Sequence, residues 1–293
     1  MSAVRFRPPA SIYNFPVSIS ALIVNYNSWD DTIRILKKLP PEIETIVVDN
    51  ASRERRIIEA SRVIFNERNL GFAAALNIGI EASSGEFIAI ITPDVDFEPE
   101  VIYELSEFLK NHPEVALVVP AAYTPSGKIW PMARMVSNPL SFFLCGRRSP
   151  LSSLSGKCRE KFTYESLNEP SEIEAAVGTF MLIRKRAWED VGGFDSSLFF
   201  YTEDLDISIR LRKRGWKIYI LPHIRIIHNV GKIRKAHSFF AESRRTQSFY
   251  RFFTKHYRSM RILKPILFAG AFLHIAQMGL KYLLGIPPRD PHW

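Results

Sequence analysis

The stretch EFIAIITPDVDFEP, residues 86–99, decides the fold that this chain can adopt. Five consecutive apolar residues, 87–91, run into a Thr-Pro pair, and Asp94 and Asp96 follow. A short apolar run closed by turn residues is typical of a strand that is buried on both faces of a sheet. Two carboxylates one residue apart repel each other unless a positive charge lies between them. The stretch therefore predicts a buried strand that ends at an acidic site.

Comparable strands alternate with helices on both sides of this stretch. Apolar runs predict further strands at 18–25, 44–50, 62–69 and 115–120, and helical spacing predicts helices over 29–39, 71–83 and 98–113. Alternation of this kind predicts an α/β fold with a mainly parallel central sheet and flanking helices.

Polar residues follow the predicted strands, where ligands bind in open α/β sheets. Because parallel crossovers share one hand, the carboxyl ends of these strands are expected to meet at one edge. The residues at those ends are Asn25 and Asn27, Asp49 and Asn50, Asn66 and Asn69, and Asp94 and Asp96. The pattern predicts a ligand site at this edge.

The pattern loosens after residue 120. Residues 121–135 predict a hairpin, residues 137–171 a long loop, and the segment around 173–195 a strand and a short helix. Then FFYTEDLDISIRLRKRGW, residues 199–216, places three acids, Glu203, Asp204 and Asp206, in a first helical turn. The helix dipole favours acids there. The preceding aromatic residues would also raise the pKa of a carboxylate, as a general base requires.

Composition places the chain among ordinary globular proteins, with 46% hydrophobic and 24% charged residues. Two cysteines, Cys145 and Cys158, suggest neither a disulfide framework nor a zinc site, and they fit a reducing compartment. The opening residues lack the apolar run of a signal peptide. From Lys232 onward there are twelve Lys and Arg and two acids, so that segment carries a net charge of +10. The whole chain carries +9, so the remaining residues carry about −1.

Two explanations of Asp94 and Asp96 are open from the residues alone. A divalent cation, Mg²⁺ or Mn²⁺, would neutralise both and could be shared with the phosphates of a substrate. Alternatively, Asp94 caps a helix that starts near Glu98, and Asp96 is solvated.

Six motifs in order make the chain resemble family 2 of the glycosyltransferases, the inverting group with the GT-A fold, and above all its rhamnosyltransferase-like bacterial members. The resemblance runs from about Val17 to about Gly231. The motifs are ALIVNYNSWD, IVVDNAS, NERNLGFAAALNIGI, ITPDVDFEP, VGTFMLIRKRAWEDVGGFDSSLFFYTEDLDISIRLRKRGW and IIHNVG.

The resemblance implies roles for individual residues. A nucleoside diphosphate sugar would be bound by Asn25, Asn27, Asp49, Asn50 and Asp94, with Asn69, Gly71 and Asn77 shaping the loop and helix beside the nucleotide. Asp204 matches the catalytic base that takes a proton from the acceptor hydroxyl, and Gly178 and Glu203 fall near the acceptor.

The metal ligands implied by the resemblance are Asp96, Asp94 and His228. The sequence departs from many relatives here, because Thr92-Pro93-Asp94 replaces Asn-Pro-Asp and many relatives lack an acid at position 96. Either aspartate could therefore be the principal ligand of the Mg²⁺ or Mn²⁺ ion, and Asp96 is slightly favoured.

Three segments are expected: an N-terminal extension (1–16), a GT-A domain (17–231) and a basic, amphipathic helical region (232–293). The apolar residues of 262–286 are too often interrupted for a spanning helix. With the basic residues before them they predict a peripheral anchor on an anionic membrane surface. Packing on the domain, or in a homodimer through these helices, is the alternative. The resemblance implies a lipid-linked glycan acceptor at the cytoplasmic face of the cell membrane.

The expected reaction is inverting transfer of a sugar to a hydroxyl group during cell-surface glycan synthesis, with dTDP-rhamnose as the expected donor. A UDP-sugar, of galactose or N-acetylglucosamine, is the alternative donor. A nucleic-acid-binding protein would explain the basic tail but not the acidic strand ends, so no nucleic acid is expected. A dehydrogenase is excluded by the first βα turn, VNYNSWD, which lacks G-x-G-x-x-G.

Overall fold

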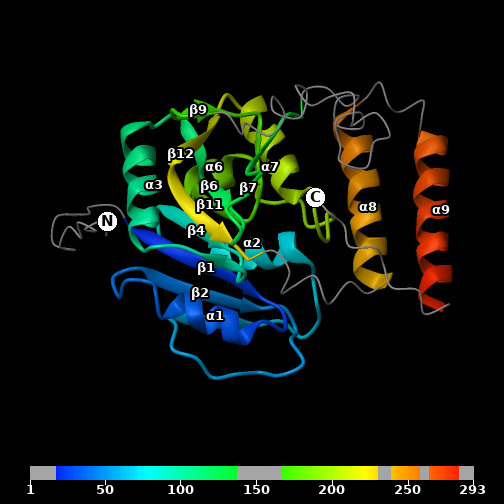
Figure 1. Cartoon of the computed structure of the whole chain (residues 1–293), viewed down its shortest axis with the longest axis horizontal. Helices are drawn as coiled ribbons and strands as arrows, with labels where there is room; N and C mark the ends of the chain where they lie inside the picture. Colours follow the sequence, from blue (N-terminus) through cyan, green and yellow to red (C-terminus); the bar gives the residue numbers. More distant parts are fainter. Residues whose placement is uncertain (1–17, 137–166, 230–238, 258–263, 284–293) are drawn as a thin grey trace.

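The computed structural model describes residues 18–136, 167–229, 239–257 and 264–283 (Figure 1). A central sheet with flanking helices forms the body of the molecule, and two long helices stand side by side at one end of it. The predicted α/β architecture is confirmed. Cys145, Cys158 and most of the predicted 137–171 loop lie outside the described residues.

The main sheet has the strand order β3-β2-β1-β4-β11-β6-β12-β5. These strands are β1 (Ile19–Asn25), β2 (Glu44–Asp49), β3 (Arg62–Phe65), β4 (Phe87–Ile91), β5 (Val95–Asp96), β6 (Val115–Tyr123), β11 (Phe180–Arg184) and β12 (Lys217–His228). The short strands β7 (Ile129–Trp130) and β9 (Ser171–Glu172) pair with β6 and β12, and β8 (Ala133–Arg134) pairs with β10 (Ala175–Ala176) in a separate sheet. The predicted 121–135 hairpin is confirmed by the antiparallel pairing of β6 with β7.

The long strands of the sheet are mainly parallel, and the sequence pattern does not reveal that a central strand runs the other way. β3, β2, β1 and β4 run parallel, and β6 runs parallel to β12. Between these two sets lies β11, antiparallel to both β4 and β6. Because its direction is reversed, β11 begins where its parallel neighbours end. The residues that precede β11 therefore join the carboxyl edge of the sheet.

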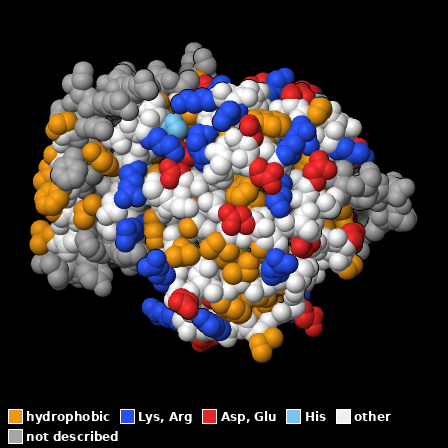
Figure 2. All heavy atoms as spheres, turned by 180° about the vertical axis from the view of Figure 1, so that it is seen from behind, with side chains coloured by type: hydrophobic (Ala, Val, Ile, Leu, Met, Phe, Trp, Pro, Cys, Tyr) orange, Lys and Arg blue, Asp and Glu red, His pale blue; other side chains and the backbone are white. Residues whose placement is uncertain are grey.

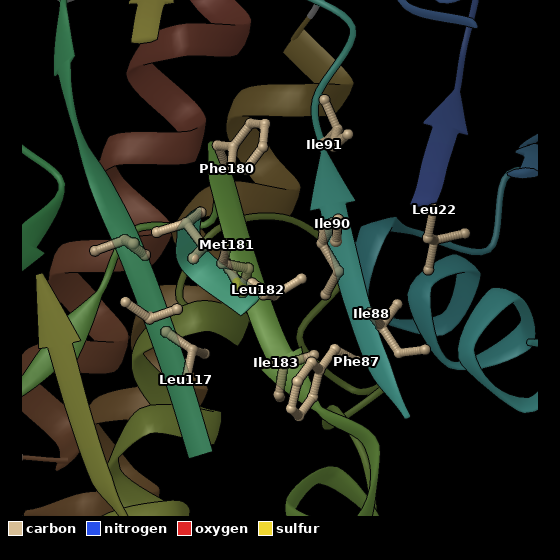
Figure 3. Packing of buried hydrophobic residues seen from close by; sticks show 14 of the residues in the cluster. Leu22, Phe87, Ile88, Ile90, Ile91, Leu117, Phe180, Met181, Leu182 and Ile183 are labelled. Carbon is tan, nitrogen blue, oxygen red and sulfur yellow. The ribbon is translucent and has the colours of Figure 1, made fainter. Parts of the chain in front are cut away.

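The core of the sheet consists of strands that are buried on both faces. Every residue of β1, β4 and β11 is buried, as continuous apolar sequences predict for central strands. In Figure 3 the side chains of Leu22, Ile90 and Met181 project from these three neighbouring strands. This packing fixes the ends of the strands, where the polar residues lie.

Helices cover the sheet and carry part of the site. They are α1 (Trp29–Leu36), α2 (Phe72–Ala82), α3 (Glu100–Asn111), α6 (Lys185–Asp190) and α7 (Glu203–Lys213). The predicted helix of 98–113 is confirmed as α3, but its N-cap residue is Pro99, without a side-chain cap. The alternative role of Asp94 as a helix cap is therefore not observed.

The C-terminal region contributes α8 (Phe239–His256) and α9 (Lys264–Leu283). α8 packs on the body of the molecule, because Phe252, Phe253 and Tyr257 form a second apolar cluster with Leu205 of α7. Its basic residues also contact the body, since Arg251 donates to the carbonyl oxygen of Ser197. These contacts agree with the alternative that the helical region packs on the domain, and association with a membrane stays a prediction.

α9 exposes apolar side chains, among them Phe272, Leu273 and Leu280. Figure 2 shows hydrophobic side chains along this end of the molecule, with a band of Lys and Arg side chains beside them. None of the helices in the described ranges combines the length and the apolarity needed to cross a membrane.

Candidate functional site

The ends of β1 and β2 are connected by a network of buried hydrogen bonds around Asp49. Asn25 donates from Nδ2 to Asp49 Oδ1 at 2.6 Å and to Ser52 Oγ at 3.0 Å. Its Oδ1 accepts hydrogen bonds from the hydroxyls of Ser28 and Thr32. All the hydrogen-bonding capacity of Asn25 is used inside the protein. It therefore positions Asp49 and has no atom left for direct contact with a nucleotide.

Asn27 lies at the surface beside this network. Its backbone adopts a left-handed conformation with φ of 54°, and its Oδ1 accepts a hydrogen bond from the backbone N–H of Arg53 at 2.9 Å. The Nδ2 group makes no hydrogen bond with the described residues, so Asn27 retains a donor for a ligand.

A second amide network lies between β2 and α2. Asn50 donates to Asn69 Oδ1 at 3.0 Å and to the carbonyl oxygen of Gly71 at 3.1 Å, and it accepts from Asn66 Nδ2 and from the backbone N–H of Leu70. Asn50 is thus saturated and buried. The network holds the predicted loop in shape, and Asn69 contributes to it.

Gly71 and Asn77 attach α2 to the segment before α7. Gly71 has φ of +88°, and a Cβ atom built on it would lie 2.5 Å from the carbonyl oxygen of Phe199. Asn77 donates to the carbonyl oxygen of Phe194 at 2.8 Å and accepts from the backbone N–H of the same residue at 2.8 Å. Both residues fix the position of α2 against this segment, and their contact with a nucleotide stays a prediction.

The first acidic centre consists of Asp94 and His228. The Nε2 group of His228 donates to Asp94 Oδ2 at 3.0 Å, and the hydroxyl of Thr92 donates to Asp94 Oδ1 at 2.7 Å. Burial alone would raise the pKa of Asp94, but the hydrogen bond and charge of His228 and the Thr92 hydroxyl hold it below its ordinary value. Asp94 is therefore ionised at neutral pH although it is buried.

Asp96 lies apart from this centre. Its carboxylate pairs with Lys38, which follows α1, and at 3.5 Å with Arg34, which lies in α1. The two aspartates of the opening stretch therefore tolerate each other because each has its own cationic or hydrogen-bonding partners. This differs from the expectation that Asp94 and Asp96 share one cation. In the described ranges, no three His, Cys, Asp or Glu residues form a group suited to a metal ion.

The second acidic centre is the first turn of α7. The backbone N–H of Gly178 donates to Asp204 Oδ2 at 2.9 Å, and that of Leu205 donates to Asp204 Oδ1 at 2.8 Å. Burial raises the pKa of Asp204 despite these hydrogen bonds. Burial and the neighbouring Asp204 raise the pKa of Glu203 further, well above its ordinary value. Of the two neighbouring carboxyl groups, Glu203 therefore holds its proton more tightly, and Asp204 is the one that ionises more readily.

The backbone before α7 is strained. Tyr201 and Thr202 both adopt left-handed conformations, with φ of 67° and 68°, and both are non-glycine residues. Such residues cost free energy and are concentrated at functional sites. The strain here directs the start of α7, and with it Glu203 and Asp204, toward Gly178.

Short contacts connect the two acidic centres. Thr92, which binds Asp94, donates its backbone N–H to the carbonyl oxygen of Thr179 at 3.1 Å. Thr179 follows Gly178, whose N–H binds Asp204. The predicted residues Asp94, His228, Gly178, Glu203 and Asp204 are thus brought together, and the residues before the reversed strand β11 make the connection.

Four buried polar atoms without a hydrogen-bond partner also lie around these two centres. In the described residues they are Trp130 Nε1, Thr202 Oγ1, Glu203 Oε2 and His228 Nδ1. The ring of Trp130 meets that of His228 edge-on, with centroids 4.6 Å apart. Trp130 was not predicted as a site residue because it follows a hairpin turn far from every motif. Since buried polar groups are normally satisfied, these atoms mark a place where a ligand can bind.

Two family models match the chain. Glycosyl transferase family 2 matches residues 20–192, and Glycosyl transferase family group 2 matches residues 156–286. The chain is 29% identical to the N-acetylglucosaminyl-diphospho-decaprenol L-rhamnosyltransferase of Mycobacterium tuberculosis over 191 residues. The aligned region covers 60% of each chain. It is 26% identical over 229 residues to the dTDP-rhamnosyl transferase RfbF of Shigella flexneri, covering 73% of this chain and 70% of that one.

Solved structures with the same fold include GalNAc-T7 with UDP, GalNAc and Mn²⁺, at a TM-score of 0.55 and 14% identity. That match covers 94% of this chain and 59% of the other. The mannosyltransferase PcManGT from Pyrobaculum calidifontis, in complex with GDP-Man and Mn²⁺, gives a TM-score of 0.52 and 18% identity over 90% and 71% of the two chains. These likenesses confirm the GT-A fold, and the family match covers more than half of the sequence. The chain belongs to glycosyl transferase family 2.

Proposed function

We propose that this chain transfers a sugar, with inversion, from a nucleoside diphosphate sugar to a hydroxyl group of a lipid-linked or polysaccharide acceptor. The observation that carries the proposal is the connection of two different acidic centres at one sheet edge. Asp94 is held ionised next to His228, whereas Asp204 has a raised pKa next to Gly178. The first suits charge neutralisation at a diphosphate and the second suits proton abstraction.

Asp94 and His228 fit a divalent cation, Mg²⁺ or Mn²⁺. Because Nε2 of His228 is engaged by Asp94, Nδ1 is the ring nitrogen left for a cation, and it is buried without a hydrogen-bond partner among the described residues. A carboxylate that orients a histidine in this way is common at metal sites. When bound, the cation would neutralise charge on the departing diphosphate. We therefore place the metal at Asp94 and His228 and not at Asp96, whose charge is paired with Lys38 and Arg34.

Asp204 is the proposed catalytic base. Its Oδ2 atom is held by the backbone N–H of Gly178, so the carboxylate keeps one orientation toward an acceptor hydroxyl. Burial and the neighbouring Asp204 raise the pKa of Glu203 well above its ordinary value, which favours a single negative charge on the pair, at Asp204. A Cβ atom at Gly178 would lie 3.1 Å from Cε of Met181 and 3.6 Å from Oδ2 of Asp204, so a larger side chain at this position would crowd the carboxylate.

For the donor, we propose dTDP-rhamnose, with a UDP-sugar of galactose or N-acetylglucosamine as the alternative. Support comes from the names of the mycobacterial and Shigella relatives, both rhamnosyl transferases. The chain spans 60% of the length of the mycobacterial relative. Asn27 and Asp49 are the residues of the β1–β2 end that would contact the nucleoside.

A lipid-linked acceptor would bring the chain to an anionic membrane surface at the cytoplasmic face. The exposed apolar side chains of α9 support peripheral association there. The GT-A domain (17–231) would act on the acceptor, with the C-terminal region (232–293) next to the lipid.

Thermal unfolding with dTDP, UDP and GDP, each with and without Mn²⁺, tests the proposal. A ligand that binds the folded state raises the midpoint according to its concentration over Kd. We expect a Mn²⁺-dependent shift with dTDP. A shift with UDP alone would assign the alternative donor, and a folded sample that responds to none of the three would refute the proposal.

A further inference from the structure

A cavity of about 370 Å³ lies between α7 and the end of α8. It adjoins the second apolar cluster, in which Leu205 of α7 contacts the aromatic residues of α8. The residues that line it are Val136, Ile209, Arg212, Lys213, His256 and Tyr257. Among the described residues, the lining contains two full cations, a histidine and three apolar or aromatic side chains, and no carboxylate.

The cations and one apolar residue come from a single face of α7. Ile209, Arg212 and Lys213 are spaced i, i+3 and i+4, so they lie together on the helix surface. Basic residues are favoured in the last turn of any helix. Arg210 of the same turn is fully engaged, however, with Asp206 and two backbone carbonyls. Arg212 and Lys213 line the cavity and make no ion pair or hydrogen bond with the described residues.

The cavity is close to the proposed catalytic base. Ile209 follows Asp204 by five residues of α7, which corresponds to about 7.5 Å along the helix axis. On the opposite wall, Val136 follows Arg134 by two residues, and the charge of Arg134 acts on Asp204. Both α7 and the segment of Arg134 and Val136 thus extend from the cavity to the surroundings of Asp204, where an acceptor hydroxyl would be deprotonated.

We propose that this cavity binds the diphosphate–lipid end of the acceptor. Arg212 and Lys213 would bind the phosphate oxygens, while Val136, Ile209 and Tyr257 would contact the first carbons of the lipid. A ligand with an anionic group directly followed by an apolar chain matches a cavity with cations next to apolar walls. The inference rests on the proposed function and adds a subsite for the acceptor, whose sugar would reach from the cavity to Asp204.

Calorimetric titration of the full chain with farnesyl diphosphate, inorganic diphosphate and farnesol tests the subsite. Farnesyl diphosphate is expected to bind more tightly than either of its parts. The double variant Arg212→Gln/Lys213→Gln should weaken its binding by about tenfold or more, because two charge-assisted contacts are lost. Arg214→Gln is the matched control, since Arg214 is exposed at the same helix end but does not line the cavity. It should bind like the wild type.

A phospholipid headgroup is the other source of such a phosphate. Vesicles of phosphatidylglycerol distinguish the two sources, because the double variant is expected to bind them like the R214Q control. The proposal would be overturned if the double variant bound farnesyl diphosphate with unchanged affinity. If that variant also lost binding to the vesicles, the two cations would instead bind a phospholipid headgroup. Nucleotide-induced thermal shifts on the same variants separate this test from the proposed function. A normal Mn²⁺-dependent shift without binding of farnesyl diphosphate would refute the subsite alone.

Discussion

Replacing Asp206 by asparagine is expected to destabilise the protein strongly at neutral pH. Asp206 is fully buried in the first turn of α7, where His256 Nε2 lies 2.6 Å from its carboxylate, and Arg210 Nε and Lys255 Nζ each lie 2.7 Å away. Burial alone would raise the pKa of Asp206. The hydrogen bond from His256 and the charges of Arg210 and Lys255 lower it from 3.8 to about 2.

This pKa difference sets the size of the effect. Stabilisation of the ionised form in the folded state contributes about 2.5 kcal/mol to the free energy of unfolding at pH 7. Because the pKa of the folded state lies below that of the unfolded state, the contribution is complete above about pH 5 and decreases as the pH falls through 3.8 toward 2. About half of it should remain at pH 3.

Urea unfolding of the wild type and of Asp206→Asn, at pH 7 and at pH values between 5 and 3, provides the measurement. Asp30→Asn is the matched control, because Asp30 also forms an ion pair, with Arg56, but its side chain is 89% exposed. The control should change the free energy of unfolding by less than about 1 kcal/mol. If Asp206→Asn is as stable as the control at pH 7, or if its deficit does not shrink in acid, the electrostatic argument is refuted.

Three further outcomes are expected. Gly71→Ala should lower the free energy of unfolding, measured with urea, by about 2–4 kcal/mol, because its Cβ atom would clash with the backbone and its φ is left-handed. Gly127 has a similar φ but open space around it, so Gly127→Ala should lower the free energy of unfolding by only about 1 kcal/mol. Asp94→Asn should abolish the Mn²⁺-dependent part of the nucleotide thermal shift, and Asp96→Asn should retain it; the reverse result would return the metal to Asp96. Asp204→Asn should keep that shift but lose at least about 100-fold in kcat in a sugar-transfer assay, and native turnover would remove Asp204 from the mechanism.

Much of the fold follows from local sequence patterns. The apolar runs that become β1, β2, β4 and β6 are continuous, so their positions could be predicted, and the polar residues that follow β1, β2 and β4 could be predicted as a candidate site. The direction of β11 could not. Its sequence, FMLIR, is that of any buried strand, and its partners lie about 65 residues earlier in β6 and about 90 to 97 residues earlier in β4. Local periodicity contains no information about which way such a strand runs.

The candidate site was predicted in its main residues but not in their pairings. Asp94 and Asp96 look equivalent in the sequence, and only the placement of α1 gives Asp96 its partners Lys38 and Arg34. In the sequence, Lys255 belongs to a run of basic residues without nearby acids. In the structure it pairs with Asp195 and Asp206, which lie about 50 to 60 residues earlier. Side-chain pairing across such distances depends on the tertiary structure alone.

The reversed strand β11 also has a consequence for biosynthesis. Residues 18–136 contain β1, β2, β3, β4 and β6, but the place between β4 and β6 stays empty until residues 180–184 leave the ribosome. Until then the nascent chain exposes two apolar strand edges, and unpaired edges of this kind promote association between chains. Closing the sheet joins segments that are distant in sequence, which makes this step slow. The same step places Gly178 for its hydrogen bond to Asp204, so the proposed catalytic edge is completed only when the sheet itself is closed.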